Sequence, residues 1–200
     1  LLYNRGVKSE EIEPFLSADR RLEGNPFLLP DISQAVSRVY KAVLAREKIA
    51  VYGDFDVDGV TAIVILVEGL SRLGAEVITY IPDRVNEGHG LKISALEKLQ
   101  AQGASLVITV DCGVTDLAEV KQAREMGMDM IITDHHIPLG SLPRAVAVID
   151  PKRKDSMYPY PDLAGAGVAF KFLQALFHED SRGKWLAGLM DLVVLATVTD

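Results

Sequence analysis

The chain has 200 residues, of which 28 are acidic and 21 basic, so its formal net charge at pH 7 is −7, and 48 % of its residues are hydrophobic. This composition excludes disordered and fibrous classes and suits one domain, with or without a small satellite. A single cysteine, Cys112, excludes a disulfide framework, and no apolar stretch is long enough to cross a membrane, so we expect a cytoplasmic protein.

Apolar runs and amphipathic stretches alternate along most of the chain. A short helix is predicted over residues 9–16, and a second helix, with Asp31 as its N-cap, extends to residue 44. The pattern then predicts strands over residues 49–52, 77–81, 106–110, 130–133 and 146–149, and helices over residues 59–73, 93–102 and 117–126. Residues 151–162 contain three prolines and are expected to form a loop.

This alternation predicts an α/β fold with a doubly wound, mostly parallel sheet, flanking helices and a helical segment after the sheet. We expect two parts, an α/β domain over residues 1–162 and a helical segment over residues 163–200. Gly165 and Gly167, near the start of that segment, are expected to allow close helix packing.

An unusual polar cluster follows each of four predicted strands. The clusters, in chain order, are Asp54, Asp56 and Asp58, then Asp83-Arg84, then Asp111-Cys112-Gly113, and then Asp134-His135-His136. The carboxyl ends of parallel strands lie along one edge of a sheet, where such folds bind ligands. We therefore expect the four clusters to meet in one crevice.

Several aspartates and two histidines in one crevice repel one another or take up protons unless a cation neutralises them. Carboxylate and imidazole ligands without thiolate disfavour structural zinc and suit Mn²⁺, Mg²⁺ or Fe²⁺. With this many carboxylates, two ions that share a bridging aspartate and activate a water are expected, and such a site most often hydrolyses a phosphate ester.

Each cluster also has a simpler interpretation. The stretch from Asp54 to Gly59 matches the start of a calcium-binding EF-hand loop, although the twelfth position is Ile65 instead of glutamate. Asp56-Val57-Asp58-Gly59 after a strand resembles the start of haloacid-dehalogenase-type phosphatases, whose first aspartate is a covalent nucleophile. Asp134 can also be a capping aspartate beside two surface histidines.

Four stretches, in their order, resemble the successive motifs of the DHH phosphoesterase superfamily, in its branch of single-strand-specific exonucleases. They are Tyr52 to Thr61, Pro82 to Gly90, Thr109 to Gly113 and Asp134 to His136. Order and spacing match over nearly the whole chain, including Gly165 to Ala169. The chain does not begin with methionine, so we expect a fragment of a longer protein. The resemblance implies that it is the N-terminal catalytic part and that a further domain binds substrate.

The resemblance implies a metal-binding role for the aspartates of the first and third motifs. Asp56 and Asp58 would each hold one ion, with Asp54 a ligand or a close supporting carboxylate. Asp111 would bridge the two ions, and His135 would be a further ligand.

The resemblance also implies roles around these ligands. His136 would contact the scissile phosphate or its developing charge, and Asp134 would orient the histidine pair. Asp200 matches the last metal-binding aspartate of the family, and Arg84 and His89 would contact substrate phosphate or support the site.

The activity implied by the resemblance is removal of mononucleotides from the 5′ end of single-stranded DNA, in DNA repair and recombination, with two Mn²⁺ or Mg²⁺ ions. The expected partners are single-stranded DNA and a helicase or single-strand-binding protein, without a membrane, and the expected state is a monomer. Lys152 and Arg153 follow the last strand near the same sheet edge, where they either meet DNA phosphates or belong to a solvated loop.

Two other functions stay open. Some DHH relatives hydrolyse cyclic dinucleotides, short oligonucleotides, pyrophosphate or polyphosphate, although Gly53 to Asp56 favours the nuclease branch. The other is a scaffold protein that has lost its metal-binding residues, which conflicts with the full set of motif residues in this chain.

The six site aspartates account for most of the net charge, because without them the chain has 22 acidic and 21 basic residues. The acidity therefore does not exclude a nucleic-acid partner.

Overall fold

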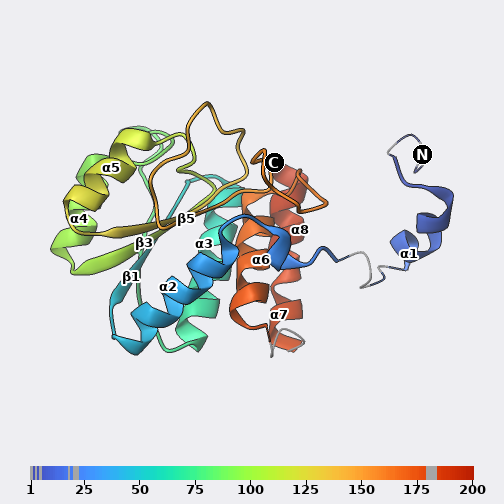
Figure 1. Cartoon of the computed structure of the whole chain (residues 1–200), viewed down its shortest axis with the longest axis horizontal. Coiled ribbons are helices and arrows are strands. Elements are labelled where there is room, and N and C mark those ends of the chain that lie inside the picture. The colour runs from blue at the N-terminus through green and yellow to red at the C-terminus, as the bar shows by residue number, and fades with distance from the viewer. Residues whose placement is uncertain (1, 3, 5, 18, 20–22, 179–183) are drawn as a thin grey trace.

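A five-stranded parallel sheet forms the centre of the computed structural model, which describes residues 2, 4, 6–17, 19, 23–178 and 184–200 (Figure 1). The strand order is β2-β1-β3-β4-β5, and every neighbouring pair is parallel. All five predicted strands are confirmed. They are β1 (Lys48–Gly53), β2 (Glu76–Tyr80), β3 (Ala104–Val110), β4 (Asp129–Thr133) and β5 (Ala147–Ile149).

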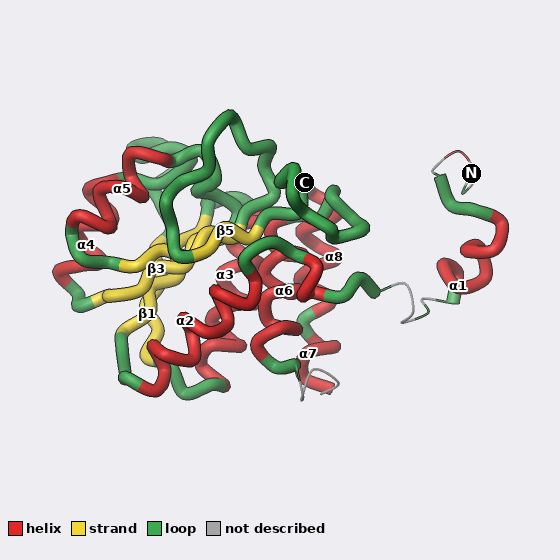
Figure 2. The backbone as a smooth tube through the Cα atoms, viewed as in Figure 1, coloured by secondary structure: helices red, strands yellow, loops and turns green. Residues whose placement is uncertain are grey.

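Helices connect the strands and continue after the last one (Figure 2). They are α1 (Ile12–Leu16), α2 (Ile32–Leu44), α3 (Val57–Arg72), α4 (Ile93–Ala101), α5 (Leu117–Glu125), α6 (Gly165–Leu176), α7 (Lys184–Gly188) and α8 (Met190–Thr199), with 3-10 turns at Ser9–Glu11 and Pro26–Leu28. The predicted helices are confirmed, except that residues 9–11 of the first form a 3-10 turn, and residues 179–183 of the predicted helical segment lie outside the described residues. Helix α3 begins earlier than expected because Asp56 caps it, its Oδ1 accepting a hydrogen bond from the Gly59 backbone N–H at 2.9 Å.

Side chains along each strand alternate between two hydrophobic layers. In β1, Ile49 and Val51 face the layer that contains α2, α3 and α6, whereas Ala50 and Tyr52 face the layer of α4 and α5. Figure 1 shows α4 and α5 on one side of the sheet and α2, α3, α6 and α8 on the other. The doubly wound fold is therefore confirmed, and burial on both faces explains why the strands read as unbroken apolar runs.

The sheet changes its winding direction between β1 and β3. The chain passes from β1 outward to β2, crosses back to β3 on the other side of β1, and then continues outward to β4 and β5. Loops after β1 and β3 therefore diverge at a topological switch point, where open α/β sheets form ligand crevices. These two loops carry residues 54–56 and Asp111.

Helix α6 belongs to the core that covers the sheet. All of its residues except Gln174 are buried, and it packs along α3, where Gly69 leaves room for the side chain of Leu173. Helix α8 packs against both α3 and α6. The division of the chain at residue 162 stays a prediction, and α6 contributes to the same hydrophobic cluster as β1 and β3.

Asp31 is the N-cap residue of α2, as predicted, but its side chain does not cap the helix. Its backbone has a φ of 54°, and its side chain makes no capping hydrogen bond. Instead, its Oδ2 accepts hydrogen bonds from the backbone N–H of Val148 at 3.1 Å and from the guanidinium of Arg153 at 2.6 Å. The carboxylate thus joins the start of α2 to β5, a contact across more than a hundred residues that local sequence cannot indicate.

A bilayer crossing needs a long apolar helix, and no helix in the described part of the chain meets that requirement.

Substitution of Gly59 tests how closely the start of α3 approaches the chain that follows β1. A β-carbon at position 59 would lie 2.5 Å from the backbone oxygen of Asp54, which cannot move aside as a side-chain end can. We expect Gly59→Ala to lower the free energy of unfolding by about 1–3 kcal/mol in urea denaturation. The control is Gly188→Ala, whose added β-carbon has nothing within 4 Å, so a neutral effect or a gain of up to about 1 kcal/mol is expected. Equal stability of the two variants would contradict this packing.

Candidate metal centre

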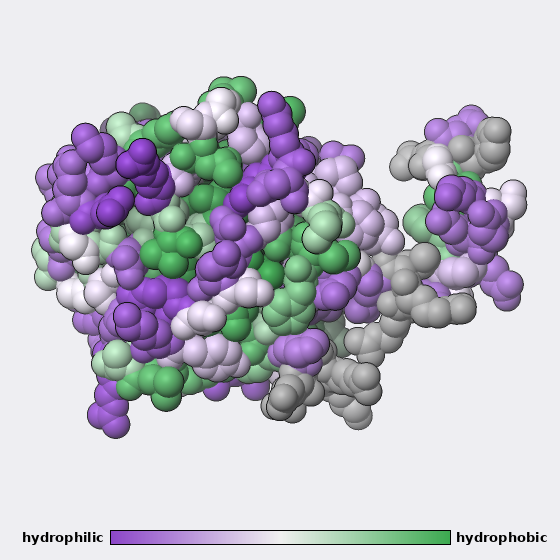
Figure 3. Space-filling model, in the orientation of Figure 1, coloured by the Kyte–Doolittle hydropathy of each residue, from purple (hydrophilic) through white to green (hydrophobic). Residues whose placement is uncertain are grey.

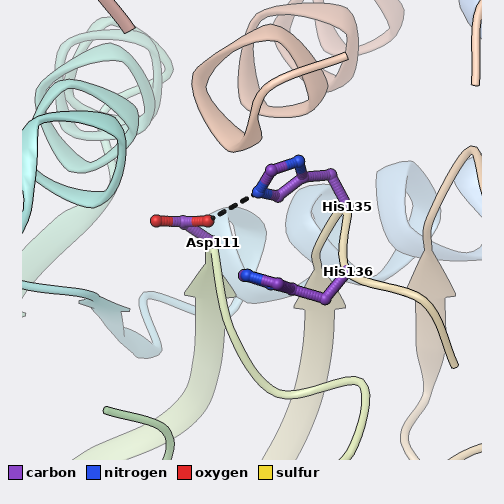
Figure 4. Close-up of side chains that lie close together, drawn as sticks. All are labelled: Asp111, His135 and His136. Atoms are coloured by element: carbon purple, nitrogen blue, oxygen red, sulfur yellow. Dashed lines mark hydrogen bonds and ion pairs between the residues drawn. The ribbon is translucent and has the colours of Figure 1, made fainter. Parts of the chain in front are cut away.

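The imidazole of His135 lies at the centre of the polar cluster. Its Nε2 is 3.0 Å from Oδ1 of Asp111 and 3.5 Å from Oδ2 of Asp58, and its Nδ1 is 3.8 Å from Oδ2 of Asp200. Figure 4 shows the His135 ring pointing toward the Asp111 carboxylate, with His136 beside it on the same loop. Side chains from the ends of β3, β4, α3 and α8 therefore meet at one imidazole.

Two groups among the described residues have the donor atoms to hold an ion. One consists of Asp111, His135 and His136, and the other of Asp58, His135 and Asp200. Within each group the donor atoms lie within 4.8 Å of one another, and His135 is common to both. Both predicted histidines and three of the predicted metal-binding aspartates are thus brought together.

Asp54 and Asp56 lie in neither group. Oδ2 of Asp54 is 2.7 Å from Nδ1 of His89, and its Oδ1 accepts a hydrogen bond from the Phe55 backbone N–H at 2.6 Å. Asp56 is exposed and caps α3 through one carboxylate oxygen. A cavity of about 280 Å³ has both Asp54 and His89 in its lining, together with Asp111, Asp134 and His136.

Asp58 is held by the start of α6. Its Oδ2 accepts a hydrogen bond from the backbone N–H of Gly165 at 2.6 Å, and its Oδ1 accepts one from Ala166 at 2.7 Å. Gly165 permits this approach, because an added β-carbon would lie 2.7 Å from Cβ of Asp111 and 3.0 Å from Oδ2 of Asp58. The close contact expected of Gly165 is therefore made with the site as well as within the helical layer.

Asp111 carries both backbone strain and an unfavourable charge. Its φ of 59° is in the left-handed region that non-glycine residues rarely adopt, and such strain persists mainly where function requires it. Burial raises the pKa of Asp111 to about 7, and the negative charge of Asp58 acts in the same direction. Burial likewise raises the pKa of Asp58, although the two α6 amides oppose this.

Asp134 orients both histidines. Its Oδ1 accepts hydrogen bonds from the backbone N–H groups of His135 and His136 at 2.7 and 3.1 Å and lies 2.8 Å from Nδ1 of His136, while its Oδ2 accepts one from the Val114 backbone N–H. The bond to Asp134 raises the pKa of His136 to about 9. Burial raises the pKa of Asp134, but His136 and the backbone donors outweigh it, so the net shift is downward.

The pKa of His135 is set by two opposing effects. Burial lowers it, but the hydrogen bond and the charge of Asp111 outweigh burial, so the pKa is raised. Asp111 and Asp134 thus each favour the protonated form of the histidine that they contact. Cys112, which is buried, contributes no thiolate because burial raises the pKa of its thiol. A donor set of carboxylates and imidazoles without thiolate fits Mn²⁺ or Mg²⁺.

The predicted substrate-contacting cations differ in their surroundings. Arg84 is exposed and lies over the Phe55 ring, 5.5 Å from its centroid, and that ring also packs against His89. Lys152 is partly exposed and, like Arg153, lines a second cavity together with residues of the loop that follows His136. The side chain of Arg153 is only 8 % exposed, because it forms ion pairs with Asp31 and Asp155, so the structure does not bring Arg153 to the centre.

Two aspartates near the centre, Asp150 and Asp116, were not singled out from the sequence. Asp150, fully buried, directly follows β5, and its Oδ1 accepts a hydrogen bond from the Lys152 backbone N–H. Burial raises its pKa to about 6. Asp116 accepts a hydrogen bond from the Leu91 backbone N–H and so holds the second motif against α5. The sequence offered one signal for Asp150, because the residue directly follows a predicted strand, as the other site aspartates do.

The fold and the centre together define a class of protein, a doubly wound α/β protein with a carboxylate and imidazole cluster at its switch point. Residues 48–197 match the model of the DHH family, N-terminal domain. The chain belongs to the DHH family.

Within that family the chain is similar to RecJ proteins. It is 40 % identical over 201 residues to the single-stranded-DNA-specific exonuclease RecJ of Bacillus subtilis, a match that covers all of this chain and 25 % of that protein. A solved structure of exonuclease RecJ bound to manganese has a TM-score of 0.71 and 34 % identity, covering 85 % of this chain and 43 % of that one. RecJ of Thermus thermophilus in complex with Mn²⁺ has a TM-score of 0.67 and 32 % identity, covering 84 % and 24 %. The chain thus spans about a quarter of the length of its curated Bacillus relative.

The raised pKa values predict how the metal-free protein responds to pH. Asp111 binds its proton more tightly in the folded chain, with a pKa of about 7 against 3.8 for an ordinary aspartate, so the stability it contributes is full below about pH 4 and is lost as pH rises through 7. His136 continues the loss toward its pKa of about 9. We expect the thermal midpoint in EDTA to fall from about pH 5 to about pH 8, and the rise on adding Mn²⁺ to be larger at about pH 8.

The control for this experiment is Asp111→Asn, which cannot ionise and should flatten the fall between about pH 4 and about pH 7. A metal-free midpoint that rises over this range in the unmodified protein would contradict the assignment.

Proposed function

We propose that the protein is a metal-dependent nuclease that removes mononucleotides from the 5′ end of single-stranded DNA. The observation that carries the proposal is the convergence of Asp58, Asp111 and Asp200 on His135, with His136 held beside them by Asp134. The similarity of the whole chain to RecJ exonucleases supports the choice of substrate.

The proposed cofactors are two Mn²⁺ or Mg²⁺ ions. Such ions, when bound, lower the pKa of a water and offset negative charge on a phosphate. The residues proposed to hold them are Asp54, Asp56, Asp58, Asp111, His135 and Asp200. Asp111 is suited to a bridging role because its carboxylate is buried close to Asp58, so that nearby positive charge would stabilise its ionised form.

His136 is proposed to act on the phosphate. With its pKa near 9 the imidazole is protonated at neutral pH, and the contact of Nδ1 with Asp134 leaves Nε2 to donate a hydrogen bond. A charged donor fixed in advance stabilises the negative charge that develops on phosphate oxygens. Asp134, fixed in turn by Val114, keeps the ring oriented through the reaction.

Substrate phosphates are proposed to meet Arg84, His89 and Lys152 around the cavity. The Phe55 ring supports the guanidinium of Arg84, and Asp54 fixes one nitrogen of His89. Arg153 can support this surface only indirectly, since its guanidinium is engaged by Asp31 and Asp155.

We further propose the cellular setting. The protein acts in the cytoplasm as a monomer in DNA repair and recombination, on single strands exposed by a helicase or coated by a single-strand-binding protein. The net charge does not oppose contact with single-stranded DNA once the site aspartates are neutralised, because the rest of the chain is nearly balanced.

Replacing Asp111 tests the proposed chemistry. We expect Asp111→Ala to lower turnover of 5′-labelled single-stranded DNA with Mn²⁺ by more than about 100-fold, the most that residues supporting a metal ligand usually cost. The assay uses the longest natural form of the protein that contains this chain. Glu97→Ala, at an exposed position of α4, is the control and should retain full activity.

Two results would contradict the proposal. One is turnover by Asp111→Ala equal to that of the unmodified protein. The other is a clear preference of the unmodified protein for a dinucleotide over a long single strand, which would assign it to the small-substrate relatives.

A further inference from the structure

The loop between β2 and α4 carries the second motif and is held in place by side chains. Its residues 81–92 are all described in the structure and belong to no helix or strand. They include Arg84 and His89, which are proposed to meet substrate phosphates. Since no backbone ladder sets the place of these two residues, hydrogen bonds from the neighbouring strands and from within the loop set it instead.

Two stacked tyrosines connect the sheet to this loop. Tyr52 and Tyr80 are paired neighbours in β1 and β2, and their rings stack with centroids 5.3 Å apart. The Tyr52 hydroxyl donates a hydrogen bond to the Gly90 carbonyl at 3.0 Å, and the Tyr80 hydroxyl donates one to Oε1 of Glu87 at 2.6 Å. The sheet therefore holds the loop on both sides of His89.

Glu87 links this support to the turn that contains Arg84. Its Oε2 accepts a hydrogen bond from the Asp83 backbone N–H at 2.7 Å, and its own backbone N–H donates one to the Asp83 carbonyl at 2.9 Å. Oδ1 of Asp83 accepts hydrogen bonds from the backbone N–H groups of Val85 and Asn86 at 2.9 and 2.8 Å. The backbone is thus fixed on both sides of Arg84.

Both oxygens of the Glu87 carboxylate are used in these contacts. The hydrogen bond from Tyr80 lowers the pKa of Glu87, so the group is ionised at neutral pH and accepts at each oxygen. A glutamine amide accepts only through its single oxygen, because its NH₂ group is a donor. Replacement by glutamine therefore removes one of the two bonds and leaves the length of the side chain unchanged.

We infer that Glu87 is a positioning residue that holds Arg84 where its guanidinium contacts a phosphate of the bound strand. The inference rests on the proposed function, which assigns Arg84 to substrate phosphates. The Phe55 ring, with its centroid 5.5 Å from the guanidinium, supports the end of the side chain, while Glu87 fixes its backbone. A cation fixed in advance loses less conformational entropy when the strand binds, so its contact contributes more to affinity.

The alternative is that Glu87 only stabilises the fold. The charge of the side chain separates the two roles, because removal of one negative charge by itself strengthens binding to a polyanion. A positioning role predicts the opposite sign for Glu87→Gln, since the displaced Arg84 loses its phosphate contact. A role in stability alone would lower the thermal midpoint and leave the affinity for the strand equal or higher.

The test compares Glu87→Gln with Glu97→Gln. Glu97 is exposed on α4, where hydrophilic residues cover the surface in Figure 3, so this control removes the same charge outside the loop. Fluorescence anisotropy in EDTA measures affinity for a labelled single strand of about 15 nucleotides over a series of salt concentrations. Hydrolysis of the same strand with Mn²⁺ gives KM and kcat. Both use the longest natural form of the protein that contains this chain.

We expect Glu87→Gln to bind the strand about 5-fold more weakly at about 0.1 M salt and to lower the slope of log K against log salt by about 0.7, as loss of one phosphate contact requires. KM should rise by the same factor, while kcat changes by less than about 2-fold. Glu97→Gln should bind no more weakly than the unmodified protein.

Arg84→Gln completes a double-mutant cycle. It should match Glu87→Gln in affinity and salt slope, and the double variant should bind no more weakly than Arg84→Gln alone, because the contact is already lost. Tyr80→Phe keeps the stacked ring but loses the bond to Glu87, so it should weaken binding as well. If Glu87→Gln does not fold, Tyr80→Phe decides, and an unchanged affinity of that variant overturns the inference.

Three further results would overturn the inference and leave the nuclease assignment in place. They are an equal or higher affinity of folded Glu87→Gln, an unchanged affinity of Arg84→Gln, and a double variant about 25-fold weaker, which is the product of two independent losses. Failure of the unmodified protein to bind or hydrolyse any single strand would instead overturn the proposed function, and the inference with it.

Discussion

The carboxylates of Asp58 and Asp111 both lie within 3.5 Å of one imidazole nitrogen of His135, and all three side chains are buried. Like charges brought this close out of water oppose folding unless donors or cations balance them. Much of the surrounding architecture answers this constraint. Two amides at the start of α6 hold Asp58, and Gly165 lets that helix end approach. The opposition that remains is seen in the raised pKa of Asp111, and a divalent cation would relieve it.

The two histidines of the Asp-His-His motif have different surroundings in the fold. His135 is buried among carboxylates, whereas the side chain of His136 is more than half exposed and depends on Asp134 for its orientation and its charge. Asp134 can do this because its own position is set by three backbone amides around it. Adjacent residues thus have different surroundings, since His135 lies inside the carboxylate cluster and His136 lines the cavity.

Much of the acidity of the chain is concentrated in one place. The acidic cluster lies at the switch point of the sheet, and without the six site aspartates the chain has 22 acidic and 21 basic residues. The net charge of −7 conceals this concentration. An acidic chain can therefore still meet an anionic polymer, because local fields and bound ions, instead of net charge, decide what approaches a site.

The sequence by itself determined the order of strands and helices, the parallel sheet and the convergence of the motif residues, because apolar periodicity and position after a strand are local properties. Asp54, Asp111 and Asp134 needed no more than that rule. The tertiary structure alone decided which atoms meet. The amides that hold Asp58 come from more than a hundred residues away, the side chain of the N-cap residue Asp31 bonds to β5 instead of to its own helix, and Arg153 forms ion pairs inside the fold. Such contacts depend on how distant helices pack, which no periodicity within one segment records.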